Sequence, residues 1–245
     1  MVLKNKLVNI NFDYKKKIRT VSLCLAAIEN ADFIEFSDFD FLNCSEKKYL
    51  RSNISNLRRI SYVCGRYAAK KAVNSLDKGF NLRDIYVENG VFKHPVLKNK
   101  ELDITISHAE NYSVSLAFSR NFVFGIDIEK TDGINIDSLA RILDIRELEM
   151  LTDIEQDLHK KLLLLWALKE ALGKCLKTGI NINLDILGVR FIKKMHDYFE
   201  GEFLNFPQYK FIVFAYENFY ISIVFPKYID FSFDVNKFIK LPFGF

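Results

Sequence analysis

The sequence predicts an α+β fold made of two similar halves. A helical stretch followed by a group of short strands occurs twice along the chain, once in each half. Phenylalanine is frequent, at 23 residues, and in the second half Phe and Tyr alternate with Ile and Val as half-buried strands require. These two observations predict substantial β-structure with helices packed beside it.

The first half opens with about 45 residues of strand and loop and continues into a helical stretch, Ser45 to Leu76. Apolar residues recur there at helical spacing, so we expect a basic amphipathic helix whose outer side carries Arg59, Arg66, Lys70 and Lys71. Short strands are expected after this helix at Ile85–Val87, Ile104–Ser107, Ser113–Phe118 and Phe122–Glu129.

The second half has a helical region from about Gly133 to Lys177, strongest at Leu162–Leu176. Pro226 is expected to end the last core strand, because proline cannot donate to a sheet. Strands are predicted at Leu187–Ile192, Lys210–Tyr216 and Tyr220–Phe225. We therefore expect an N-terminal half at 1–120, a C-terminal half at 121–226 and a Phe-rich tail at 227–245.

Composition sets broad limits on the protein class. The chain has 245 residues, of which 49% are apolar and 27% charged, as in an ordinary globular protein. The four cysteines are widely spaced without a C-x-x-C pair, which argues against a structural zinc site and a disulfide scaffold and favours the reducing cytoplasm. No apolar run reaches the roughly 18 residues of a membrane span, so no membrane partner is expected.

Residues 47–71 contain eight basic side chains and no acidic one. Such a block is often only the solvated face of a helix; the functional interpretation is a patch for phosphates or an acidic partner. The block lacks the interleaved aromatic residues that single-stranded nucleic acid would need, so nucleic acid is not an expected partner.

Two carboxylates follow each other along an expected strand, at Asp127 and Glu129. Alternation places both on one face of the strand and Ile126 and Ile128 on the other. The plain alternative is a strand whose polar face meets water. Against it, adjacent carboxylates raise one another's pKa unless a cation lies between them.

Trp166, Glu170 and Lys174 have i, i+4, i+8 spacing and line one stripe of an expected helix. The stripe alone would also suit an ordinary Glu–Lys helix pair worth a few tenths of a kcal/mol. A third polar group, Ser107 and His108, lies where a strand runs into a loop, and its side chains could bond a phosphate.

In this order, Ser-His, Gly-Ile-Asp-Ile-Glu and Trp-x-x-Lys-Glu-Ala-x-x-Lys resemble the motifs of 4'-phosphopantetheinyl transferases of the surfactin-synthetase-activating (Sfp) type. The segment Gly65–Ala72 also resembles that family's first-half motif, and the resemblance runs from about Leu42 to Phe225. It implies two pseudo-symmetric α+β halves with the active site at their interface. The implied reaction moves the phosphopantetheine arm of coenzyme A to a serine of an apo acyl or peptidyl carrier protein and releases 3',5'-ADP.

The resemblance also implies roles for the carboxylates. Asp127, Glu129 and Glu170 would bind Mg²⁺, which in turn binds the coenzyme A pyrophosphate; such a metal prefers a few carboxylates with phosphates and waters. Lys174 would meet the α-phosphate and assist the leaving group. Glu170 is the candidate base for the serine hydroxyl.

The implied contacts to the rest of coenzyme A involve the first half. Ser107 and His108 would lie against the pyrophosphate and the 3'-phosphate end of the nucleotide. Lys93 replaces the lysine of the family's Gly-Lys-Pro element, which is Lys93-His94-Pro95 here. The 3'-phosphate itself would be held by one or more of Arg58, Arg59 and Arg66.

The sequence is also consistent with other carrier substrates and other functions. The enzyme could serve the fatty-acid carrier protein or carriers of polyketide and nonribosomal peptide synthesis. A chain with two similar halves indicates a pseudo-dimeric monomer rather than the short trimeric type. Outside this reaction, the alternatives are a non-catalytic coenzyme A- or carrier-binding module and another Mg²⁺-dependent enzyme acting on phosphates.

Overall fold

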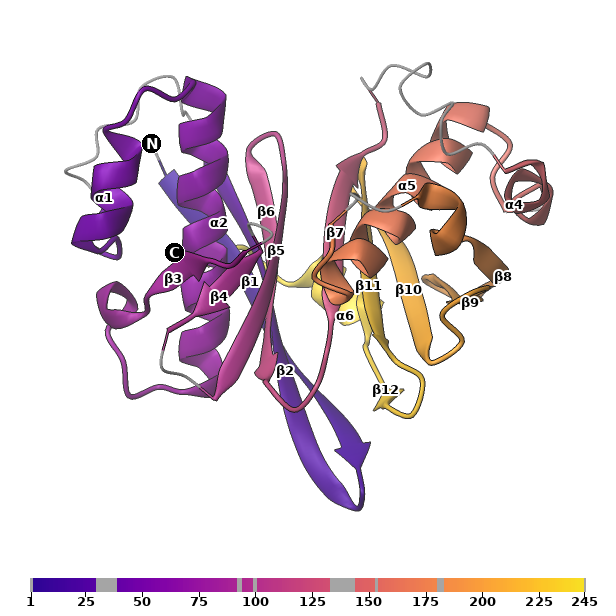
Figure 1. The fold of residues 1–245 in the computed structure, drawn as a ribbon, viewed down its shortest axis with the longest axis horizontal. Coiled ribbons are helices and arrows are strands. Elements are labelled where there is room, and N and C mark those ends of the chain that lie inside the picture. The colour runs from indigo at the N-terminus through magenta and orange to yellow at the C-terminus, as the bar shows by residue number, and fades with distance from the viewer. Residues whose placement is uncertain are drawn as a thin grey trace. The chain divides into compact units, whose positions relative to one another are not determined.

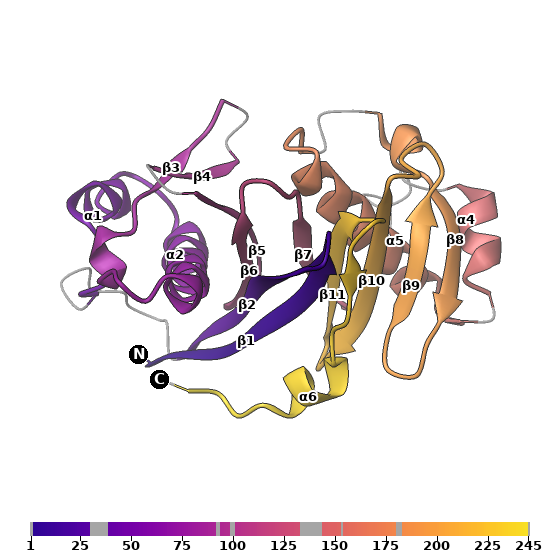
Figure 2. The same ribbon diagram turned by 90° about the horizontal axis from the view of Figure 1, so that it is seen from below.

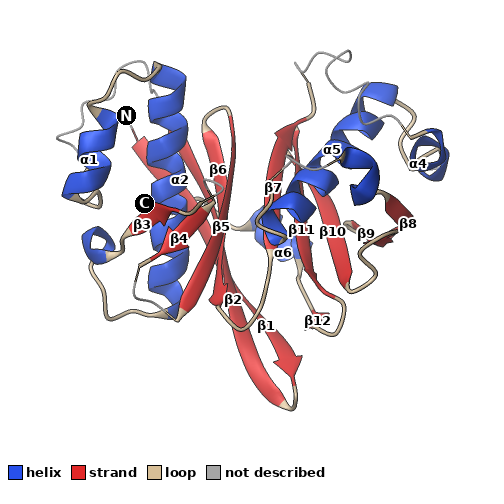
Figure 3. Ribbon diagram, viewed as in Figure 1, coloured by secondary structure: helices blue, strands red, loops and turns tan. Residues whose placement is uncertain are grey.

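The computed structural model describes residues 2–29, 39–91, 94–98, 101–132, 144–152, 154–179 and 183–244. Each of two compact units combines an antiparallel sheet with a long helix, which confirms the predicted α+β class (Figures 1 and 3). The first unit comprises Met1–Asn11, Arg19–Asn121 and Leu241–Phe245, and the second comprises Phe12–Ile18 and Phe122–Lys240. None of the helices in the described ranges is long and apolar enough for a membrane crossing.

The first unit is built on a sheet in which β1, β2, β6 and β5 are neighbours in that order. Helix α2 packs on β6 and β5. A separate two-stranded sheet pairs β3 with β4. The elements are β1 (Val2–Tyr14), β2 (Lys17–Glu29), α1 (Cys44–Leu50), α2 (Asn56–Leu76), η2 (Leu82–Asp84), β3 (Val87–Asn89), β4 (Pro95–Leu97), β5 (Leu102–Ala109) and β6 (Tyr112–Ser119).

The helical stretch expected at Ser45–Leu76 is two helices, because each has its own start signal. Asn43 caps α1 in a capping box, in which Glu46 bonds back to the cap backbone. A second N-cap, Ser55, accepts from the backbone of Arg58 and begins α2.

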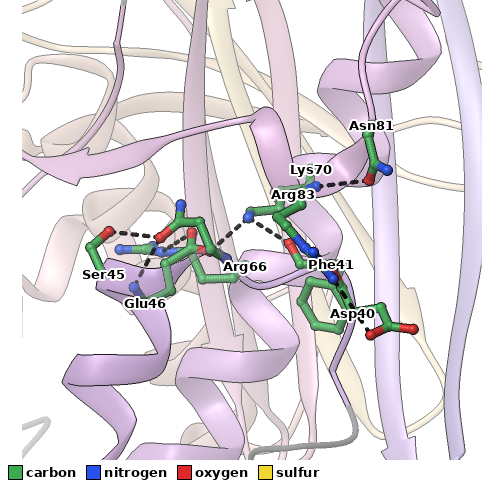
Figure 4. A network of polar contacts seen from close by, with 9 residues as sticks. Asp40, Phe41, Ser45, Glu46, Arg66, Lys70, Asn81 and Arg83 are labelled. Atoms are coloured by element: carbon green, nitrogen blue, oxygen red, sulfur yellow. Dashed lines mark hydrogen bonds and ion pairs between the residues drawn. The ribbon is translucent and has the colours of Figure 1, made fainter.

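The expectation that Arg66 and Lys70 face outward is wrong, since both are buried, Lys70 completely. The cause is Glu46, whose carboxylate is also buried. The Lys70 ammonium lies 2.6 Å from Glu46 Oε2 and donates to the carbonyl of Phe41 at 2.8 Å (Figure 4). The Arg66 guanidinium lies 3.6 Å from Glu46 Oε1 and over the ring of Tyr62. A buried lysine needs such a partner, so the pair locks α1 onto α2.

The second unit is built on a sheet with the order β7-β11-β10-β9-β8. Helix α5 covers β7, β11 and part of β10 (Figures 1 and 2). The elements are β7 (Gly125–Lys130), α4 (Ile145–Met150), α5 (Leu158–Cys175), η4 (Leu184–Leu187), β8 (Val189–Lys194), β9 (Phe199–Phe203), β10 (Tyr209–Tyr216), β11 (Phe219–Pro226), β12 (Asp230–Phe231) and α6 (Val235–Lys240).

Several boundaries in the sheets differ from the sequence prediction. The strand expected from Leu187 begins at Val189, because the preceding residues form a 3₁₀ turn capped by Asn183. Strand β9 was not predicted, since its sequence Phe-Glu-Gly-Glu-Phe is short and carries a central glycine. In the first unit, the strand expected at Ile85–Val87 shares only its last residue with β3.

The Phe-rich tail is part of the packed structure. Strand β12 pairs with the end of β1, with Phe231 opposite Phe12. Phe238 of α6 is fully buried, and its ring lies edge-on to that of Phe214 in β10. The tail therefore covers apolar surface of the second unit.

We predict that Glu46→Ala lowers the free energy of unfolding by about 3–5 kcal/mol, because it leaves the buried Lys70 without its carboxylate partner. Urea denaturation followed by circular dichroism measures the change. Glu29→Ala is the matched control: it breaks the half-exposed Lys4–Glu29 pair, which should cost under about 1 kcal/mol. Equal losses in both variants would contradict the role given to the buried pair.

Candidate active site

Strand β7 carries the first two carboxylates of the site. It pairs with β11, with Asp127 opposite Ser222 and Glu129 opposite Tyr220. Ile126 and Ile128 are fully buried on the other face, as the alternation predicts. Asp127 is only 1% exposed, so its carboxylate is held inside the unit rather than in water.

Helix α5 approaches β7 closely because a glycine stands at the crossing. A Cβ on Gly125 would lie 1.9 Å from the carbonyl oxygen of Ala171 and 2.8 Å from the backbone nitrogen of Cys175. On the neighbouring strand, the Ser222 hydroxyl donates to the carbonyl of Ala167 at 2.7 Å. These contacts place the helix stripe that contains Glu170 directly beside the carboxylates of β7.

The polar side chains of β7 and α5 form one connected cluster. Lys174 Nζ lies 2.5 Å from Asp127 Oδ1 and 3.9 Å from Glu170 Oε2. Trp166 Nε1 donates to Glu129 Oε1 at 3.0 Å. The structure thus brings together all three predicted metal ligands and Lys174, and it gives the tryptophan of the stripe a polar role.

Burial and the crowding of acidic groups raise the pKa of two of these carboxylates, Glu129 and Glu170. Burial, and then the charge of Asp127, raise the pKa of Glu129 to about 8, although Lys174 and the Trp166 hydrogen bond oppose this. Burial is also the main cause of the raised pKa of Glu170, which Lys174 partly offsets. A further cation in this cluster would stabilise the charged carboxylates.

The donor chemistry of the cluster fits Mg²⁺. Carboxylate oxygens are the protein ligands that Mg²⁺ takes, and it leaves the remaining positions to waters and substrate phosphates. Within the described ranges, no three acidic, histidine or cysteine side chains are already arranged around a metal position. Instead, the ammonium of Lys174 lies between Asp127 and Glu170, so binding a metal requires that this lysine turn away.

The first unit has a cavity of about 190 Å³ lined by Arg58, Arg66 and His108. His108 reaches it from β5 together with Ile106, two residues earlier on the same face. Gly65 also lines it, and a Cβ there would lie 3.2 Å from Ile106, so the glycine keeps α2 close to the strand. Two arginines and a histidine in one small cavity suit a phosphate group.

Other predicted site residues are placed elsewhere or are not described. Ser107 is buried and, one residue before His108 in β5, lies on the opposite face of the strand. Arg59 donates to the carbonyls of Leu50 and Ser52, both at 3.2 Å, and does not line the cavity. Lys93 lies outside the described residues.

A buried pair next to the site was not predicted from the sequence. The ammonium of Lys169 lies 2.8 Å from Glu147 Oε2, and the other oxygen of Glu147 accepts from the backbone of Val189 at 2.6 Å. One carboxylate therefore links α4, α5 and β8. It also fixes the rotation of α5, in which Glu170 directly follows Lys169. Lys169 belongs to the Trp-x-x-Lys-Glu-Ala motif, but no spacing in the sequence pointed to Glu147.

Comparison with known families gives a match over the segment that holds the carboxylate cluster. Residues 123–224 match the family model of the 4'-phosphopantetheinyl transferase superfamily. The match supports that superfamily, and transfer of phosphopantetheine as the class of activity, over less than half of the chain. A search of curated proteins finds no significant match.

We predict that Gly125→Ala lowers the free energy of unfolding by at least about 2 kcal/mol, since the new methyl group must push α5 away from β7. Thermal or urea unfolding measures the loss. Gly79→Ala is the control, because the nearest atom to its Cβ is a side-chain oxygen at 3.6 Å, and it should change stability by under about 0.5 kcal/mol. Normal stability of Gly125→Ala would refute the close approach.

Proposed function

We propose that this protein is a Mg²⁺-dependent phosphopantetheinyl transferase of the Sfp type that converts apo acyl or peptidyl carrier proteins to their holo form. The serine oxygen of the carrier forms a bond to the β-phosphorus of coenzyme A, the phosphoric anhydride bond breaks, and 3',5'-ADP leaves. The observation that carries the proposal is the cluster of three carboxylates and Lys174 on β7 and α5, inside the segment that matches the superfamily.

Asp127, Glu129 and Glu170 are the residues that would hold Mg²⁺. When bound, the metal supplies positive charge that stabilises the phosphates as negative charge builds on the leaving group. The protein contributes the position of the ligands. Glu129 is oriented by the indole of Trp166, and Asp127 is held in a buried strand, so little reorganisation of these two is needed.

We propose that Lys174 stabilises negative charge on the leaving group and that Glu170 accepts the proton of the serine hydroxyl. Lys174 already faces the carboxylates and, after a rotamer change, can donate to the α-phosphate and to the departing oxygen. Glu170 has a raised pKa because it is largely buried, which makes its carboxylate a stronger base toward the serine hydroxyl.

The cavity of the first unit is our candidate site for the 3'-phosphate of coenzyme A. Arg58 is the more available of its two arginines, since its side chain is exposed and, among the described residues, donates to the phenol of Tyr49 at 3.3 Å. Arg66 is already near Glu46, so it contributes charge that is partly neutralised. His108 adds a third polar side chain to the cavity lining.

We propose that the enzyme is located in the cytoplasm. All four cysteines are free thiols, which suits a reducing cytoplasm. We propose a monomer, because one chain contains two α+β units.

We predict that the purified chain, incubated with coenzyme A, Mg²⁺ and an apo carrier protein, adds one phosphopantetheine group to the carrier, as intact-protein mass spectrometry would show. EDTA should stop the reaction. Asp127→Asn and Glu170→Gln should each slow it at least about 100-fold, because each removes charge from the proposed metal site.

The control for these variants is Glu149→Gln, which removes an exposed carboxylate of α4 and should retain normal activity. Circular dichroism and the unfolding midpoint must show that all variants are folded. If no fatty-acid, polyketide or peptidyl carrier gains mass, the transferase proposal fails. Coenzyme A binding without transfer would then favour a binding module, and hydrolysis of another phosphate ester would favour a different Mg²⁺ enzyme.

We further predict that Arg58→Ala raises the KM for coenzyme A about tenfold but changes the KM for 3'-dephospho-coenzyme A little, because a charged hydrogen bond to the 3'-phosphate is lost. Arg59→Ala is the matched control, since this arginine is bonded to backbone carbonyls outside the cavity. Steady-state kinetics with both substrates measures the effect. An equal rise of both KM values in Arg58→Ala would show that the cavity does not bind the 3'-phosphate.

A further inference from the structure

The turn between β1 and β2 has an unfavourable choice of residues. Tyr14 ends one strand and Lys17 begins the next, so Lys15 and Lys16 form a two-residue hairpin loop. Their φ angles are 52° and 61°, which places both in the left-handed region. Loops of this kind strongly prefer Asn-Gly, because most side chains are strained there. The sequence instead has lysine at both positions.

The residues beside this loop are also cationic. Lys15, Lys16, Lys17 and Arg19 occupy four of five consecutive positions, and we call them the hairpin tip. None of the four makes an ion pair with another residue of the described ranges. The fifth position is Ile18, which is 75% exposed, an unusual value for an isoleucine in a strand.

The two-residue loop of the hairpin tip, Lys15 and Lys16, is held on a packed aromatic base within the second unit. The ring of Tyr14 lies 5.1 Å from that of Phe122 and 5.3 Å from that of Tyr228. Tyr228 is itself 60% exposed. The nearest acidic residues on these strands, Asp13 and Asp230, face each other across β1 and β12. The base fixes the direction of the loop, so the lysines are presented on a rigid support.

A purely connecting role does not account for the lysines in the loop. If the loop served only to join the strands, asparagine and glycine would fill it with less strain, so stability does not explain the lysines. Strain kept at an exposed position, together with positive charge that no carboxylate of the described ranges neutralises and exposed apolar side chains, is typical of a binding surface. The charge selects an acidic partner, and Ile18 and Tyr228 give that partner apolar contact area.

We propose that the hairpin tip docks an acidic face of the carrier protein. This inference rests on the proposed function for the identity of the partner. The tip affects association with the carrier rather than the chemical step, because complementary charge raises the encounter rate of two proteins. Salt screens this attraction. None of its residues lines the first unit's cavity, whose basic residues we assign to coenzyme A.

The test uses a double substitution that has opposite effects on stability and docking. Lys15→Asn with Lys16→Gly should raise the unfolding midpoint by about 2–4 °C, because it relieves the strained loop. The same variant should raise the KM for the apo carrier about fivefold at low ionic strength, with a smaller effect at high salt. Affinity for coenzyme A, measured by isothermal titration calorimetry, should be unchanged.

Two further variants separate charge from position. Lys15→Arg with Lys16→Arg keeps the charge and should have nearly the wild-type KM for the carrier. Lys193→Gln with Lys194→Gln removes two exposed lysines of β8 and should also leave this KM unchanged. A loss in this second control equal to that of the loop variant would overturn the proposal, because net charge rather than the hairpin tip would then be responsible.

The outcome can be distinguished from failure of the proposed function. If the wild-type chain modifies a carrier and the Asn-Gly variant has the same KM, the docking proposal is wrong and the transferase proposal stands. If no carrier is modified, the transferase proposal fails. In that case, binding of the carrier is measured by fluorescence anisotropy, and equal affinity for wild type and variant would overturn the docking proposal as well. Tip-dependent binding to vesicles of phosphatidylcholine with 30% phosphatidylserine, without an effect on the carrier, would point to a lipid surface instead.

Discussion

The crowding of three carboxylates against helix α5 is the constraint on which the rest of the second unit depends. Asp127, Glu129 and Glu170 are largely buried, and the charge of Asp127 adds to burial in raising the pKa of Glu129 and of Glu170. Such a group keeps its members charged more readily when cations lie among them. Lys174 fills this need in the structure, and we propose that Mg²⁺ fills it during the reaction. Gly125 makes the arrangement possible, because any side chain there would separate the strand from the helix.

The long helix of each unit is fixed by a buried lysine. In the first unit Lys70 of α2 binds Glu46 of the short helix α1, and in the second unit Lys169 of α5 binds Glu147 of the short helix α4. Both pairs are almost completely buried. Burying such a pair costs desolvation energy, so it is a weak source of net stability, but breaking it is expensive. The pairs therefore act mainly by fixing which helix face meets the sheet, and so where the site residues point.

The local periodicities of the sequence predicted the face on which each carboxylate lies, and the resemblance to the transferase motifs predicted that these faces meet. Alternation along residues 124–129 and the i, i+4 spacing of Glu170 and Lys174 each define a face, and the structure brings those faces together. The outward orientation expected for Lys70 was wrong because its partner Glu46 lies 24 positions away, at the edge of the basic block. Helical spacing identifies the apolar face but cannot reveal a buried partner on another element. The same limit hid Glu147, whose partner and backbone contact come from two distant segments.

We propose that these carboxylates form one divalent metal site when coenzyme A is present. Binding of Mn²⁺, followed by the loss of the free-ion signal in electron paramagnetic resonance, tests it without relying on turnover. We predict one bound ion per chain for the wild type with coenzyme A, competed by Mg²⁺, and none for Asp127→Asn with Glu170→Gln at the same concentrations. Undiminished binding by that folded double variant would contradict the assignment of the site.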